Sequence, residues 1–77
     1  MLSTYAAPTA LPAALGVARH QVATALREVD RIITGFVARR AAVTAVHGPA
    51  GYTARLADWL RRRDALAAEL ADLEPDQ

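Results

Sequence analysis

The stretch AVTAVHGPAGYTARL, residues 42–56, decides the fold, because two apolar patterns of helical spacing meet in it. Apolar residues before the break recur every three, four or seven positions, at Leu11, Leu15, Ala18, Val22, Leu26, Val29, Ile33, Phe36 and Val43. A second stripe comprises Tyr52, Leu56, Trp59, Leu66, Leu70 and Leu73. Between the stripes, Gly48 suits the left-handed position after a helix, and Pro49 cannot continue that helix. Two helices joined by a turn are therefore predicted.

The expected fold class is all-α, an antiparallel helical hairpin. Its long helix covers about residues 11–47 and its second helix about residues 52–73. We expect residues 1–10 to form an extended arm, because Pro8 favours extended backbone in the residue before it. Residues 74–77 are expected to be a flexible tail. A break at Gly16, which would separate a short N-terminal helix from the long one, is the alternative.

Composition limits the chain to one small domain. It has 77 residues and no cysteine, which excludes a disulfide framework and a thiolate metal site. His20 and His47 lie at opposite ends of the long helix, and Glu28 and Asp30 project from different sides of it. We therefore expect no metal, no cofactor and no catalytic residue, and the chain is predicted not to be an enzyme.

The predicted hairpin leaves part of its long helix uncovered. A turn at residues 48–51 would place Val43 opposite Leu56, Phe36 near Arg63, Val29 near Leu70 and Leu26 near Leu73. The second helix ends there, so the preceding apolar residues lack a cover: Leu11, Leu15, Val17, Ala18 and Val22. Burying about three such side chains contributes on the order of 5 kcal/mol, comparable to the stability of a small domain. We therefore interpret this segment as a docking arm for another chain. A segment that bends at Gly16 and folds back on its own hairpin is the alternative.

Two arginines fall within the apolar stripes and complete the predicted interface. Arg40 lies at the middle of the first stripe, and Arg63 lies close to the middle of the second. One explanation is that their stems cover apolar surface, with Arg40 against Trp59 and Arg63 against Phe36 as cation–π contacts. The other is that both meet carboxylates or carbonyls of a partner chain and set its register.

Charge gives little reason to expect nucleic acid or membrane partners. The formal net charge is +1, and Arg61, Arg62 and Arg63 point about 100° apart around a helix, so they form no patch. Residues 1–47 carry five arginines and two acids, whereas residues 48–77 carry four arginines and six acids. This asymmetry suits antiparallel arms or a head-to-tail contact between copies. No membrane span and no recognisable signal peptide are predicted, and a cytoplasmic or virion-associated location is expected.

One short run resembles a known enzyme family. Residues 26–33, LREVDRII, followed by FVARR at 36–40, resemble the first helix of the small all-α chorismate mutases. The resemblance covers about fifteen residues and implies Arg27 as a ligand for a substrate carboxylate. The family's later catalytic residues have no counterpart in this chain, so we adopt no family from it.

The expected function is a small non-catalytic structural or assembly subunit. It would oligomerise or dock on a larger protein through its apolar helix stripe, as a component of a virion or another large complex of a host with a high-G+C genome. The alternative is a regulatory adaptor, either antitoxin-like or linked to nucleic acid. An accessory subunit of an enzyme comes third.

Overall fold

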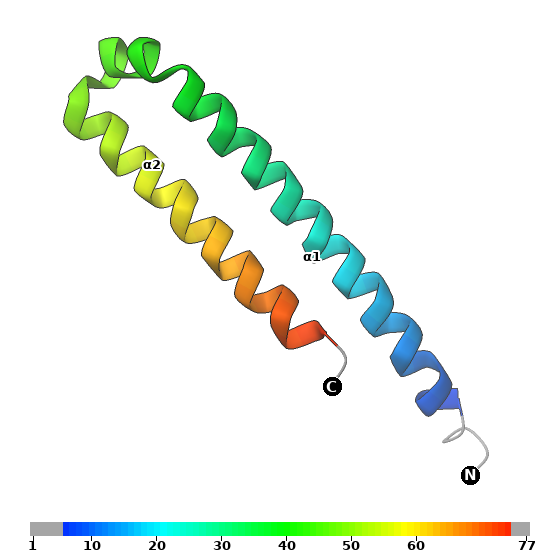
Figure 1. Cartoon of the computed structure of the whole chain (residues 1–77). Coiled ribbons are helices and arrows are strands. Elements are labelled where there is room, and N and C mark those ends of the chain that lie inside the picture. The colour runs from blue at the N-terminus through cyan, green and yellow to red at the C-terminus, as the bar shows by residue number, and fades with distance from the viewer. Residues whose placement is uncertain (1–5, 75–77) are drawn as a thin grey trace.

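The chain folds as an antiparallel hairpin of two long helices. The computed structural model describes residues 6–74, with side chains from residue 14 onward. Helix α1 spans Ala6–Ala38 and α2 spans Arg40–Leu73. The two helices run side by side in opposite directions, and the rod measures 64 × 22 × 16 Å (Figure 1). Only Arg39 and Glu74 of the described residues lie outside a helix, so the predicted all-α hairpin is confirmed.

Helix α1 begins earlier than predicted and runs without a break. Its first residue is Ala6 rather than Leu11, because Pro8 falls in the first turn, where backbone N–H groups have no helical partner. The rest of the predicted extended arm, residues 1–5, lies outside the described residues. Gly16 is an ordinary helical residue, and α1 continues past the end of α2 without folding back (Figure 1). The break at Gly16 is therefore not observed.

The first turn of the hairpin occurs at Arg39, not at Gly48 as predicted. Arg39 leaves the helical conformation, with φ −103° and ψ 28°. Its backbone N–H and its Nε both donate to the carbonyl of Gly35, at 3.1 and 3.2 Å. A Cβ on Gly35 would lie 2.9 Å from Nη2 of Arg39, so the missing side chain makes room for this contact. The arginine thereby satisfies a carbonyl that α1 leaves free at its C-terminal end.

A second change of direction occurs at Gly48, inside α2. Gly48 has φ 79° and ψ 166°, so the positive φ expected there is confirmed, but ψ is extended rather than left-handed helical. This conformation is essentially confined to glycine. Pro49 follows, and Thr53 Oγ1 donates to the Pro49 carbonyl at 3.1 Å. We call residues 39–48 the bend segment, since they form a short helical piece between two kinks.

The bend segment shifts the pairing of the helices. Phe36 stacks on Tyr52, with ring centroids 5.0 Å apart and an interplanar angle of 11°. Phe36 was predicted to lie near Arg63, which is about three helical turns further along α2. The predicted neighbours of Val29 and Leu26 shift with it.

The shifted register covers more of α1 than predicted. Because antiparallel helices rise equally per residue, Val22 lies at about the level of Leu66, and Leu15 at about the level of Leu73. Val22 is accordingly buried, at 9% exposure. The prediction that the apolar stripe is bare as far as Val22 is therefore wrong.

The resulting core is nevertheless thin. Only Val22, Ile33 and Tyr52 count as buried among the described side chains, and none is completely enclosed. The accessible surface is 5769 Å², whereas a compact protein of 8.2 kDa exposes about 4,500 Å². A two-helix rod with this surface has an incomplete core.

Gly48→Ala should destabilise the hairpin by about 1–3 kcal/mol, because alanine rarely adopts the backbone conformation of Gly48. The free energy of unfolding in urea, followed by circular dichroism, measures this. Gly16→Ala is the matched control, since neither glycine has an atom within 4 Å of an added Cβ. In the helical setting of Gly16 the change should stabilise by about 0.5–1 kcal/mol. An equal gain at both positions would show that Gly48 does not need its positive φ.

Candidate protein interface at the bend

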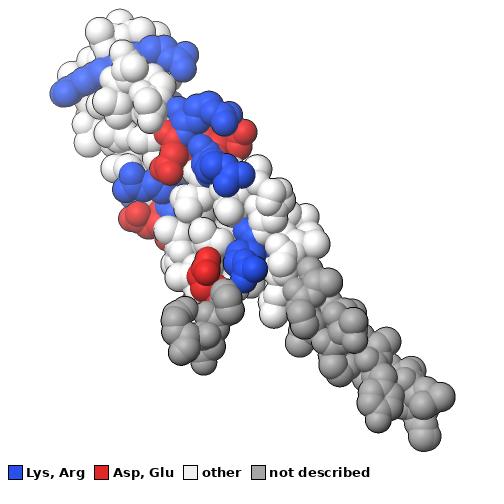
Figure 2. Space-filling model, turned by 45° about the vertical axis from the view of Figure 1, so that its right-hand side comes forward, with Lys and Arg blue, Asp and Glu red and all other residues white. Residues whose placement is uncertain are grey.

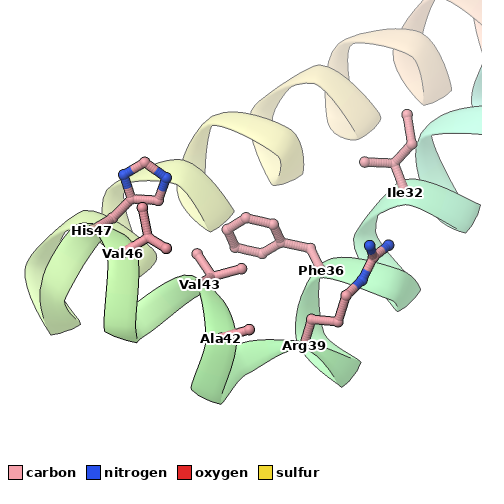
Figure 3. A pocket seen from close by; sticks show the side chains of 7 residues that line it. All are labelled: Ile32, Phe36, Arg39, Ala42, Val43, Val46 and His47. Atoms are coloured by element: carbon pink, nitrogen blue, oxygen red, sulfur yellow. The ribbon is translucent and has the colours of Figure 1, made fainter.

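The described surface is hollowed on the inner side of the bend segment. The hollow has a volume of about 410 Å³ and lies between the end of α1 and the first residues of α2 (Figure 3). We call it the bend groove, and its lining residues are Ile32, Phe36, Arg39, Ala42, Val43, Val46 and His47.

The bend groove is apolar and open to solvent. Phe36 points from α1 towards Val43 and Val46, which come from the bend segment (Figure 3). Val46 is 76% exposed and Ile32 is 40% exposed. Only Arg39 and His47 add polar atoms to the lining. A cavity with this lining fits aliphatic or aromatic side chains and offers few groups that would orient a polar substrate.

The Phe36 ring at the floor of the bend groove packs against α2 on its other side. Phe36 presents one side to the groove, while its ring stacks on the buried Tyr52 of α2. The guanidinium of Arg40 lies over the Tyr52 ring, 5.3 Å from its centroid. Stacked rings and a cation over an aromatic face each contribute about 0.5–1.5 kcal/mol beyond the area they bury. The two kinks and this stack together fix the shape of the groove.

The predicted docking residues divide into three groups. Leu15 and Val17 are exposed, at 43% and 58%, near the end of α2. Ala18 is half-buried and Val22 is buried under α2. The side chain of Leu11 lies outside the described residues. The uncovered part of the predicted stripe therefore begins at Leu15, among the side chains described.

Both predicted interface arginines lie at the edge of the hairpin. Arg40 is exposed and covers Tyr52 rather than Trp59, whose ring instead carries Arg62 at 4.4 Å. The side chain of Arg63 is 42% exposed, and its Nε lies 3.8 Å from a carboxylate oxygen of Asp64. The register shift removes Phe36 from Arg63, so the predicted cation–π pairings are wrong. That either arginine meets a partner chain stays a prediction.

The remaining polar contacts lie on the surface. Arg31 and Glu28 form an ion pair at 2.9 Å, and Arg61 pairs with Asp58. Arg27 donates to Thr24 Oγ1 at 3.2 Å. Exposed pairs of this kind contribute about 0–1 kcal/mol each. Each of these contacts stabilises a single helix, and none of them forms part of a binding or catalytic site among the described residues.

The described residues offer neither a metal site nor a membrane span. No group of three or more His, Asp or Glu side chains in that part of the chain is placed to hold a metal ion. No helix there has the length and apolar character needed to cross a bilayer.

Most of the bend groove lies outside the predicted apolar stripes. Phe36 and Val43 belong to the predicted stripe, but Ile32, Ala42 and Val46 lie beside it. Their apolar side chains become one surface only because α1 stops at Arg39. The available signal was Gly35, whose spacing of four residues from Arg39 allows the arginine to fold back onto the glycine carbonyl.

Comparison with known proteins adds no family assignment. No protein-family model matches the chain, and neither the curated proteins nor the solved structures gave a match.

Tyr52→Ala should destabilise the hairpin by about 3 kcal/mol, because it removes the buried ring that fixes the register and leaves a cavity. Thermal unfolding followed by circular dichroism measures the loss. Tyr52→Phe is the control, since it retains the stack on Phe36 and the contact with Arg40, and it should unfold within about 1 kcal/mol of the natural chain. Equal stability of the alanine and phenylalanine variants would contradict the proposed register.

Proposed function

We propose that this chain is a non-catalytic structural or assembly subunit whose apolar surface is completed by another protein chain. The observation that carries this proposal is the bend groove, an open apolar hollow with Phe36 as its floor and Val46 on its wall. A chain with three buried hydrophobic side chains among those described has little other apolar packing to stabilise it.

The energetics support a protein partner. Covering Ile32, Val43 and Val46 with apolar side chains would contribute on the order of 5 kcal/mol. That is comparable to the whole stability of a small domain. Groove-shaped apolar surfaces on helices are suited to helical partners, which insert residues spaced three or four apart. Membership of a virion or another large complex is the setting we propose, on compositional grounds.

Association of the purified chain tests the proposal, through sedimentation equilibrium and thermal unfolding at several concentrations. We expect association to raise the melting temperature as concentration rises. A broad, poorly cooperative transition of the isolated chain would also support the proposal, with a different protein as partner. An 8.2 kDa species that melts sharply and at one temperature at every concentration would contradict it.

Val46→Asp should weaken the association by about tenfold or more, because it places a charge in the bend groove. The free hairpin should keep its helicity, since Val46 is 76% exposed. Val37→Asp is the matched control, because Val37 is 49% exposed and does not line the groove. Equal effects of the two aspartates on association would exclude the groove as the contact.

A further inference from the structure

The two ends of the rod carry net charges of opposite sign, although Arg19 of α1 lies at about the level of Glu69 at the open end. Residues 32–57 contain Arg39, Arg40 and Arg55 but no aspartate or glutamate. After Arg63 the sequence has no further lysine or arginine; Glu69 and Asp72 lie in the last turns of α2, and Glu74 follows its end (Figure 2). We call these two groups of three the bend cations and the end acids. The view in Figure 2 shows basic side chains at the bend without an acidic neighbour, and an acidic side chain beside a basic one near the end of α2.

None of these six charges forms an ion pair among the described residues, although Arg39 donates to the Gly35 carbonyl and Arg40 lies over the Tyr52 ring. The ion pairs of the described chain join Arg31 to Glu28, Arg61 to Asp58 and Arg63 to Asp64, all between residues at most three positions apart in one helix. The bend cations and the end acids are exposed and take part in none of these pairs. A partner that presents acids to the bend and cations to the open end would satisfy both groups. A second copy of this chain, turned end for end, has that distribution.

The surface area that each side of the rod can bury decides whether two copies pair end to end or side by side. A stable interface buries about 800 Å² on each partner. An end face of 22 × 16 Å offers only about 350 Å², so end-to-end contact is too small. The flank is 64 Å long, and the chain exposes about 1,200 Å² more than a compact protein of its mass. Side-by-side pairing therefore supplies enough surface.

One flank of α1 leads from its open end to the bend groove. Ala18, Ala25 and Ile32 are spaced seven residues apart and so lie on one side of α1, where both alanines are half-buried and Ile32 is exposed. The alanines allow a neighbouring helix to approach closely, and Ile32 already lines the groove. Leu15 lies at the open end, at about the same level as the end acids.

We infer that the occupant of the bend groove is a second copy of this chain, in an antiparallel side-by-side dimer. Each copy places its open end at Leu15 in the groove of the other, with its end acids beside the bend cations. The same contact occurs twice about a two-fold axis, which is the commonest symmetry of soluble dimers. This inference rests on the proposed function and names its partner.

Charge reversal tests the antiparallel arrangement. Arg55→Glu reverses one bend cation, and Glu69→Arg reverses one end acid; neither residue takes part in an ion pair of the described chain. Each single variant should weaken dimerisation several-fold in sedimentation equilibrium, with helicity unchanged by circular dichroism. The chain carrying both changes should dimerise like the natural one. Full dimerisation of either single variant, or no recovery in the double variant, would overturn the inference.

Crosslinking gives a second test that leaves the charges intact. The natural chain has no cysteine, so single thiols can be placed without interference. A mixture of Leu15→Cys and Val46→Cys chains should yield the mixed 15–46 disulfide on oxidation, identified by peptide mass. Val37→Cys in place of Val46→Cys is the control and should yield little mixed product. Predominant 15–15 and 46–46 links would show parallel pairing. That result would overturn the antiparallel dimer and leave the proposed function standing. Association with a different protein only would do the same, whereas a sharply melting monomer would also overturn the proposed function.

Discussion

The stack of Phe36 on Tyr52 is the contact on which the rest of the structure depends. Two antiparallel helices with equal rise have one free variable, their register, and the stack of the half-buried Phe36 ring on the buried Tyr52 ring sets it. From that pair it follows that α2 reaches the level of Leu15 and buries Val22. It also follows that the chain between the rings must form the bend segment. The bend groove depends on this contact, because Phe36 both stacks on Tyr52 and lines the groove.

The incomplete core has a simple physical origin. Two helices in contact can bury only one face each, and alanine-rich faces bury little area when they do. The longer bend slides α2 towards the start of α1 and leaves the apolar side chains of the bend groove on a surface that α2 does not cover. The same two-helix shape leaves the charged side chains at the two ends of the rod without ion-pair partners among the described residues. Apolar and charged groups left without partners at complementary places favour a neighbour of matching shape and charge.

Much of the fold was predictable from local signals, and the rest was not. The stripes predict two helices, Leu73 is the observed end of the second, and Gly48 has the expected positive φ. The break at Arg39 carries neither glycine nor proline at that position, and depends on a side chain that folds back to Gly35. The bend groove followed from that break and could not be predicted without it. An excess of apolar surface was predictable at Leu15, but Val22 was misplaced because its cover depends on the register.

The register can be measured directly by nuclear Overhauser spectroscopy. The chain has one phenylalanine, so every contact of its ring protons is assigned to Phe36 without ambiguity. The account predicts cross-peaks between the ring protons of Phe36 and those of Tyr52. Cross-peaks from Phe36 to the side-chain methylenes of Arg63, without any to Tyr52, would contradict it.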